Sequence, residues 1–404
     1  MVARTNAGVL GVASDPCVVH SMGHLIFLLI EFLDEFVFGI QDAAWPLIRA
    51  DLHLTYLQVG ILLSVPGLLA NLVEPFLFIL GDVWKRRLII LGGGIFFTLA
   101  LGLVGGSQSF LLLMFAFILF DPSSGAFVSL SQATLVDLAG SRREQNMARW
   151  TFAGSLGVFL GPLLLGGLIG LGFGWRMGFW ILASLSALIV ILAFKLIPDR
   201  RALHSEFPAA GALLASLAST FSLLKEKTVL RWLILLECSN LMLDILYGFL
   251  ALYLVDVAGF RASAAAMAVA IWTGFGLLGD LLLIPLVERV RGLDYLRVSV
   301  VIELLLFPLL LLAAPYWLKL VFLGLLGLFH SGWYAILKAN LYASLSGRSG
   351  SALALDDVSG LLGKLIPLGI GLAAQLLGLG AAMWFLLAGP LALLIGLPPK
   401  EPHR

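Results

Sequence analysis

Twelve apolar segments, separated by short polar stretches, divide the chain. Each has about the length that a helix needs to cross a bilayer, which is roughly 20 residues at a rise of 1.5 Å per residue. The segments cover 20–48, 56–80, 88–105, 109–138, 149–172 and 175–197, then 229–255, 263–287, 293–314, 317–344, 355–378 and 380–397. The pattern predicts an all-α membrane protein with twelve transmembrane helices.

The longest polar-leaning stretch, residues 198–228, lies between the two sets of six predicted helices. We expect a linker on one membrane surface, which joins a bundle formed by residues 1–197 to a bundle formed by residues 229–404. Within the linker, residues 209–224 are amphipathic enough to form a helix in the membrane interface, although a plain tether fits equally well.

Composition agrees with a membrane protein. Of the 404 residues, 60% are hydrophobic and only 12% are charged, and the mean hydropathy is +1.04, well beyond soluble domains. No basic patch alternates with aromatic residues, so we expect no nucleic-acid partner. Two cysteines indicate no disulfide framework, and no His/Glu metal spacing or phosphate-binding loop predicts a cofactor.

The distribution of lysine and arginine predicts the orientation. With the N-terminus placed inside, 19 of these residues fall on the inner side and four on the outer side, and two lie within helices. Because short cytoplasmic loops collect positive charge, both termini are expected in the cytoplasm of a multi-pass plasma (inner) membrane protein. Residues 1–19 lack the features of a cleavable signal, so we expect the first helix to direct insertion.

The first predicted helix carries four acidic residues. At 100° per residue, Glu35 and Asp42 lie about 40° and 20° from Glu31, and Asp34 lies about 60° the other way, so all four share one face. Charged groups at membrane depth usually face a bundle interior or a wet cavity, which favours a substrate or proton pathway. The alternative is a set of structural acids, protonated or paired.

The two halves repeat one another in their acidic positions. An offset of 206 residues superposes Glu31 on Glu237, Glu74 on Asp280 and Asp82 on Glu288, and an offset of 205 superposes Pro162 on Pro367. Parallel six-helix repeats with a site near the membrane midplane are typical of secondary transporters.

The loop after the second predicted helix resembles the signature loop of the major facilitator superfamily. The matching residues are Gly81, Asp82, Lys85, Arg86 and Arg87, although the first glycine is closer than usual and a valine replaces the arginine after the aspartate. The resemblance implies a charge latch that holds the two bundles together in one state, with Glu288 at the repeated position. Positive-inside anchoring alone is the alternative.

The fifth predicted helix is similar to the motif of that superfamily's antiporters and exporters. The matching positions are Gly154, Gly157, Gly161, Pro162, Gly166 and Gly167, with one residue more than usual between the proline and the paired glycines. Small residues and a proline favour a pliable helix pair near the bundle interface, and the resemblance implies export. Ordinary close packing of membrane helices is the alternative.

In the fourth predicted helix, Asp121 stands four residues before Gly125, where the family commonly has an arginine implicated in proton transfer. An acid at this position cannot lower the pKa of a neighbouring carboxylate, as a fixed cation would. Its alternative role is to bond backbone groups that Pro122 leaves without partners.

The second half adds further candidates. Glu237 and Asp244 share a face of the seventh helix, flanked by Asn240 and Tyr247, and Lys364 on the eleventh helix is a possible partner for an acid of the first half. A binding wall for an amphipathic or cationic solute is predicted on the tenth helix from His330, Trp333, Tyr334 and Lys338. Glu303 has no assigned role.

Together these residues predict a cavity with a large excess of acid. Burial and crowding disfavour charged carboxylates, so some of them are expected to carry protons. The predicted function is a monomeric secondary transporter that exports a small amphipathic or cationic solute in exchange for protons, and we expect neither a cofactor nor catalysis. Proton symport, a membrane-embedded enzyme and a non-transporting sensor are the alternatives. The acids and the lysines are Glu31, Asp34, Glu35, Asp42, Glu74, Asp121, Glu237, Asp244, Asp280, Lys338 and Lys364.

Overall fold

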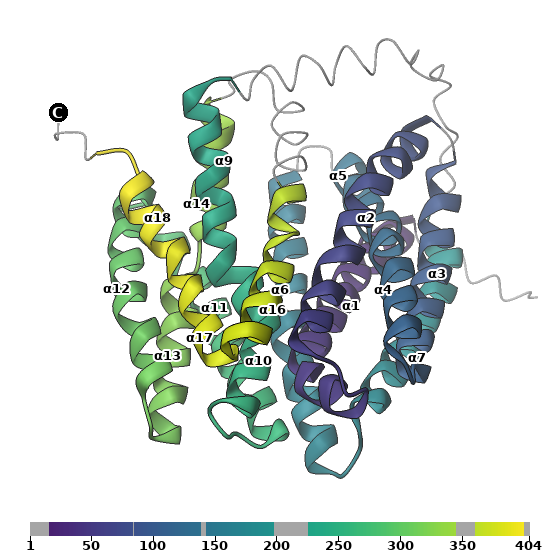
Figure 1. The fold of residues 1–404 in the computed structure, drawn as a ribbon. Coiled ribbons are helices and arrows are strands. Elements are labelled where there is room, and N and C mark those ends of the chain that lie inside the picture. Colours follow the sequence, from purple (N-terminus) through teal and green to yellow (C-terminus); the bar gives the residue numbers. More distant parts are fainter. Residues whose placement is uncertain (1–15, 84, 139–142, 198–224, 345–359, 400–404) are drawn as a thin grey trace, which may run out of the picture.

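A computed structural model describes residues 16–83, 85–138, 143–197, 225–344 and 360–399, and these residues form helices and short connections without a strand (Figure 1). The first half contains α1 (Pro16–Asp51), α2 (Tyr56–Val83), α3 (Arg86–Gly106), α4 (Phe110–Ser124), the π-helical turn η1 (Gly125–Ser129), α5 (Leu130–Leu138), α6 (Arg143–Gly170) and α7 (Trp175–Leu196).

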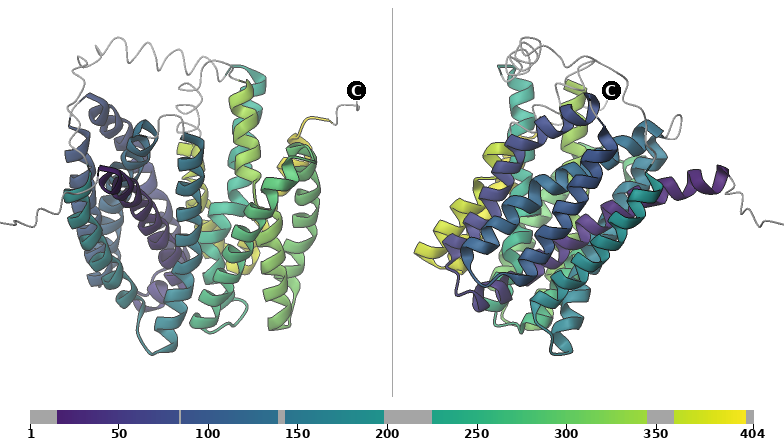
Figure 2. Two further views of the ribbon diagram at one scale, coloured as in Figure 1. Left: turned by 180° about the vertical axis from the view of Figure 1, so that it is seen from behind. Right: turned by 90° about the vertical axis from the view of Figure 1, so that its right-hand side faces the viewer.

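The second half repeats this plan. It contains α9 (Lys227–Asn240), the π-helical turn η3 (Leu241–Ile245), α10 (Leu246–Asp256), α11 (Ala262–Val287), α12 (Gly292–Leu312), α13 (Tyr316–Phe329), α14 (Trp333–Ser344), α16 (Ile366–Leu377), α17 (Leu379–Met383), the 3₁₀ turn η4 (Trp384–Leu387) and α18 (Ala388–Gly396). The two halves stand side by side as two helical bundles, seen from behind and from one side in Figure 2.

Eleven helical segments of the described chain are long and apolar enough to span a membrane. To these we add α1, which has 36 residues but carries the four acids near its middle. The helices coincide with the twelve predicted segments within a few residues. Most of the predicted linker, residues 198–224, lies outside the described part, as does the beginning of the eleventh predicted helix.

Several of the described helices depart from simple rods. Successive segments α4, η1 and α5 form one span that contains a π turn, and α9, η3 and α10 form another. The tenth predicted helix is broken between α13 and α14, where Gly332 adopts a φ of 74° that favours glycine. These breaks matter because they decide which side chains reach the space between the bundles.

The bundles touch at the end where α1 finishes and α2 begins, here called the α1–α2 side. There α2 packs against α16: a Cβ on Gly60 would lie 2.7 Å from the carbonyl oxygen of Pro367, and the hydroxyl of Ser64 accepts a 2.9 Å hydrogen bond from the amide of Leu368. The opposite end, where α7 finishes and α9 begins, is called the α7–α9 side. Among the described residues, these close contacts between α2 and α16 lie on the α1–α2 side.

Glycines of α6 allow its close approach to α1 inside the first bundle. A Cβ on Gly157 would lie 2.5 Å from the carbonyl oxygen of Phe32, and one on Gly161 would lie 2.7 Å from the backbone of Gly39. The same helix also meets α11 of the other bundle: a Cβ on Gly274 would lie 2.7 Å from the ring of Phe159, and a Cβ on Gly166 would lie 3.0 Å from the sulfur of Met267. The helix-five motif therefore serves the core of one bundle as well as the interface for which it was predicted.

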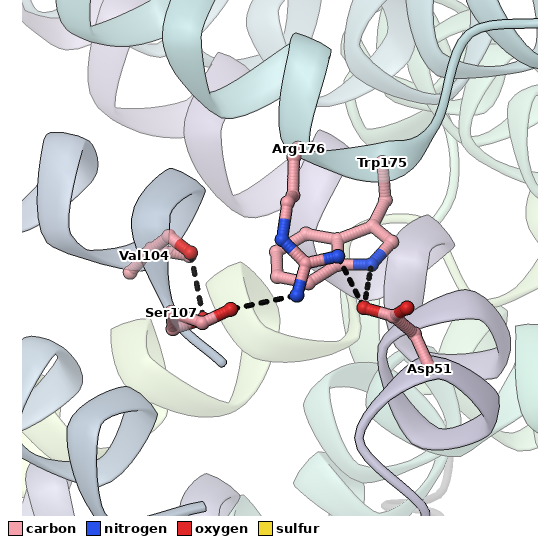
Figure 3. A network of polar contacts seen from close by, with 5 residues as sticks. All are labelled: Asp51, Val104, Ser107, Trp175 and Arg176. Atoms are coloured by element: carbon pink, nitrogen blue, oxygen red, sulfur yellow. Dashed lines mark hydrogen bonds and ion pairs between the residues drawn. The ribbon is translucent and has the colours of Figure 1, made fainter. Parts of the chain in front are cut away.

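A polar network fastens the ends of three helices on the α1–α2 side (Figure 3). Asp51 at the end of α1 accepts hydrogen bonds from the Trp175 indole at 3.3 Å and from Arg176, with which it forms an ion pair. Arg176 also donates to the carbonyl oxygen of Ser107, at the end of α3, at 2.7 Å. The network holds the first bundle together where it meets the second.

We expect Gly161→Ala to lower the free energy of unfolding by about 1–3 kcal/mol, the usual cost of overpacking, because the new methyl group would overlap the backbone of α1. Thermal unfolding of the purified protein in one detergent measures the effect. Gly167→Ala is the matched control, since nothing lies within 4 Å of its Cβ position. Equal midpoints for the two variants would contradict the close α1–α6 contact.

Candidate functional site

A cavity of about 740 Å³ lies between the bundles and is lined by helices of both halves. Such a volume is within the usual range for small-molecule sites. Nine of the predicted site residues line it: Glu31, Glu35, Asp42, Asp121, Glu237, Asp244, Asp280, His330 and Lys364. The sequence-based prediction of an acid-rich space is thus matched by the positions of these side chains.

Five other predicted site residues do not line this cavity. Asp34 is buried between α1 and α4, where it accepts a 2.8 Å hydrogen bond from Ser124, and Glu74 lies against Gly125. The remaining three, on α14, are Trp333, Tyr334 and Lys338.

The break at Gly332 explains the position of the α14 residues. Trp333 is fully buried inside the second bundle, where its indole donates a 2.8 Å hydrogen bond to Ser299. Tyr334 is 42% exposed and accepts a 2.5 Å hydrogen bond from Lys338. A continuous tenth helix would have kept these side chains on the face of His330, so the predicted wall depended on a helix that the glycine interrupts.

The acids of α1 meet acids of the second bundle across the cavity. Glu35 and Asp42 both interact electrostatically with Asp244 of η3. Lys364 lies in the same space and interacts favourably with Asp244 and with Asp121 of α4. Because Asp121 belongs to the first bundle and Asp244 to the second, this lysine lies within electrostatic range of carboxylates of both bundles.

Two π turns lie beside cavity acids. The turn η3 contains Asp244, and η1 begins four residues after Asp121. Turns of this kind insert an extra residue into a helix and occur frequently at functional sites. Pro122 was a sequence signal for irregularity in α4, but neither proline nor glycine marks residues 241–245.

An aromatic cluster forms part of the cavity wall. The ring of Trp272 lies 5.3 Å from that of Tyr247 and 5.0 Å from that of His330, between centroids. The Trp272 indole nitrogen, the Tyr247 hydroxyl and the Gln41 carbonyl oxygen are buried without a hydrogen-bond partner among the described residues. Sequence reasoning missed Trp272 and Gln41, because a single tryptophan or glutamine in an apolar helix carries no distinctive pattern.

On the α1–α2 side, a polar pairing joins the two bundles. Arg49 of α1 forms a 2.9 Å ion pair with Asp256 of α10. Tyr56 of α2 donates a 3.0 Å hydrogen bond to the same carboxylate, and its ring lies 4.1 Å below the Arg49 guanidinium. One aspartate of the second bundle therefore binds two helices of the first.

The predicted latch lies at the opposite end. Arg86 donates to the carbonyl oxygen of Gly81 at 3.3 Å and to Asp137 at 2.7 Å, and Arg87 donates to the carbonyl oxygen of Phe194 at 2.6 Å. These partners all belong to the first bundle. The Asp82 side chain lies outside the described part of the structure, while Lys85 and Glu288 are exposed, so the latch remains a prediction.

Glu303 does not line the cavity and takes no part in the Arg49–Asp256 pairing. It is fully buried in α12 within the second bundle, and neither carboxylate oxygen has a hydrogen-bond partner among the residues that the structure describes.

Comparison with known proteins identifies a family and solved structures that this chain resembles. The chain matches the sequence profile of the Major Facilitator Superfamily over residues 27–366. A point mutant of the nucleoside transporter NupG has a similar structure, with a TM-score of 0.76 and 14% identity over 93% of this chain and 98% of its own.

Two other solved transporters are also similar. For a bacterial homologue of the human lysosomal transporter Spinster, in an inward-facing and unoccupied conformation, the TM-score is 0.71 and the identity 18%, covering 95% of each chain. For the peptide transporter POT in complex with sulfate, the values are 0.69 and 15%, covering 92% of this chain and 94% of the other.

Two helical bundles around a cavity lined by carboxylates are an architecture of secondary transporters. Together with the family match over residues 27–366, they define a multi-pass membrane protein of the transporter class. The extent of the sequence match identifies the family: the chain belongs to the major facilitator superfamily. The predicted family and fold class are confirmed.

We expect Asp256→Asn to favour separation of the bundles on the α1–α2 side, because it removes the ion pair with Arg49. An exposed pair is worth at most about 1 kcal/mol, so the change in population should be about fivefold or less. The measurement is the rate at which an impermeant maleimide, added from that side, labels Leu62→Cys in a background without Cys17 and Cys238.

Asp294→Asn is the matched control for this experiment. It removes a 2.8 Å ion pair with Arg297 that lies within α12 and does not join the bundles. A labelling rate that rises equally in both variants would show that the Arg49–Asp256 pair does not hold the α1–α2 side closed.

Proposed function

We propose that this protein is a proton-coupled secondary transporter that exchanges protons for a small amphipathic or cationic solute. The observation that supports this most is the meeting of Glu35 and Asp42 from the first bundle with Asp244 from the second. Like charges at short range in a medium of low dielectric constant repel strongly, so either protons or a cation must neutralise the group.

Competition for these carboxylates supplies the coupling. A proton and a cationic solute neutralise the same charge, so binding of one lowers the affinity for the other. When the cavity faces the side of higher proton concentration, protons displace the solute; on the other side the solute displaces protons. Antiport then requires only that the bundles rearrange when the carboxylates are neutralised.

Lys364 takes part in this exchange as an internal cation. Its interactions with Asp121 and Asp244 join the two bundles, and it lies where the chain turns just before α16. Protonation of either acid removes the attraction and allows the lysine to leave that partner. The charge state of the cavity is thereby tied to contacts between the bundles.

Proton symport is the second candidate, and the same carboxylates serve it. It differs in that proton and solute bind together, as a neutral or acidic solute would allow. The similar structures include a nucleoside transporter and a peptide transporter, so solutes of those classes belong in any screen.

We further propose that the chain acts as a monomer in the plasma membrane, with both termini and the 198–228 linker in the cytoplasm. The excess of lysine and arginine on the α7–α9 side supports this orientation. With that assignment, the α1–α2 side faces outward, and the Arg49–Asp256 pair closes the outer end of the cavity.

We expect Glu35→Gln and Asp42→Asn to abolish accumulation of solute against its gradient, because each removes a proton-binding group, while at least one of the two retains exchange down the solute gradient. The assay uses proteoliposomes with an imposed pH gradient and a solute selected by thermal-shift screening.

Glu226→Gln is the control for that assay, since Glu226 is an exposed carboxylate outside the cavity. The direction of proton movement separates antiport from symport. Undiminished gradient-driven accumulation in both cavity variants would show that coupling does not depend on these two acids.

The orientation is tested in intact cells that express single-cysteine variants in a background without Cys17 and Cys238. We expect an impermeant maleimide to label His53→Cys, in the α1–α2 connection, and to leave Lys225→Cys, in the linker, unlabelled until the membrane is permeabilised. The opposite pattern would invert the proposed topology.

A further inference from the structure

The aromatic cluster of the cavity has unused hydrogen-bond donors. Trp272 is only 3% exposed, and an indole nitrogen can only donate a hydrogen bond. Neither this N–H nor the Tyr247 hydroxyl has a partner among the described residues. A buried polar group without a partner is unfavourable, because it has lost its hydrogen bonds to water, and both groups belong to residues that line the cavity. A bound molecule with a hydrogen-bond acceptor would remove that cost.

The rings themselves form a surface for a planar group. Tyr247, Trp272 and His330 come from three different elements, and their neighbouring centroids lie 5.3 Å and 5.0 Å apart. Aromatic pairs at such distances are favourable beyond the area they bury. A further ring placed against this wall would gain the same contact.

The wall lies next to the carboxylates that most need a cation. Tyr247 is close enough to Asp42 and Glu35 for electrostatic interaction. Among the described residues, the charged groups that act on Glu35 and Asp42 are other carboxylates, whereas Asp121 and Asp244 interact with Lys364. The uncompensated negative charge therefore lies at the edge of the aromatic wall.

We propose that the solute of this cavity is an arylalkylamine with a hydrogen-bond acceptor on its ring, an inference that rests on the proposed transport function and narrows it. The ammonium group binds Glu35 and Asp42, and the ring lies against Tyr247, Trp272 and His330. The ring oxygen accepts a hydrogen bond from the Trp272 indole, with the Tyr247 hydroxyl as a second donor to the same oxygen. Gln41 supplies a carbonyl acceptor for the ammonium group or the ring hydroxyl.

Four related molecules test each part of this proposal separately. Tyramine has the ring, the hydroxyl and the ammonium group; phenethylamine lacks the hydroxyl, 4-ethylphenol lacks the ammonium group, and 2-cyclohexylethylamine lacks the aromatic ring. Their affinities for the full-length protein in nanodiscs are measured by calorimetry without a pH gradient. We expect tyramine to bind about three- to tenfold more tightly than phenethylamine, the value of one hydrogen bond, and the other two to bind more weakly than tyramine.

Variants then connect each preference to a side chain. Trp272→Phe should keep the ring contact and bring the tyramine-to-phenethylamine affinity ratio close to one, and Tyr247→Phe provides a second test if the first variant fails to fold. Glu35→Gln should lower the affinity for tyramine and leave the affinity for 4-ethylphenol unchanged. Trp317→Phe is the matched control, because Trp317 is 65% exposed on the outside of α13, and it should leave all affinities unaltered.

The outcomes separate this inference from the transport function. Equal affinities for tyramine and phenethylamine, a ratio unchanged by both Trp272→Phe and Tyr247→Phe, or no binding of any of the four molecules would overturn it. If the expected affinity ratios are measured but tyramine is not accumulated in proteoliposomes with a pH gradient, the result supports the proposed binding site and contradicts the proposed proton exchange. If another solute is accumulated while tyramine does not bind, the result supports the transport function and contradicts the assignment of an arylalkylamine as the solute.

Discussion

The cost of placing carboxylates in a bilayer organises this protein. An ionised acid cannot face lipid without a large penalty, so the helix that carries Glu31, Glu35 and Asp42 must lie where other helices and a cavity surround it. The glycines of α6 permit that enclosure, because they let α1 approach to backbone contact. The close packing of α6 against α1 thus follows from the need to shield the charges of α1 from lipid.

Closure between the bundles depends on contacts of a different kind. Asp256 binds Arg49 and Tyr56, yet all three are partly exposed, and exposed ion pairs contribute little individually. Around them, small residues such as Gly60 bring α2 and α16 together without interlocking large side chains. An interface built from weak polar contacts and flat packing can open without a large barrier, as alternating access requires.

Local sequence pattern was sufficient for the helices and for the shared face of the α1 acids, because both follow from helical periodicity. It was insufficient for Trp333 and Tyr334, since the break at Gly332 turns them away from His330. Asp34 shows a further limit: periodicity places it near the cavity face, but Ser124 of a neighbouring helix binds it. Trp272 became recognisable only when the fold brought it beside Tyr247.

The π turn η3 has a consequence for how such a cavity changes during evolution. It accommodates one residue more than an α-helix would, and Asp244 lies within it while Tyr247 follows directly after its end. Loss of a single residue between 241 and 245 would restore regular helix at that point and change which side chains of the stretch face the cavity. Deletions at this point would therefore exchange the side chains presented to the solute while both ends of the span kept their packing, giving a route to new specificity that substitutions alone do not offer.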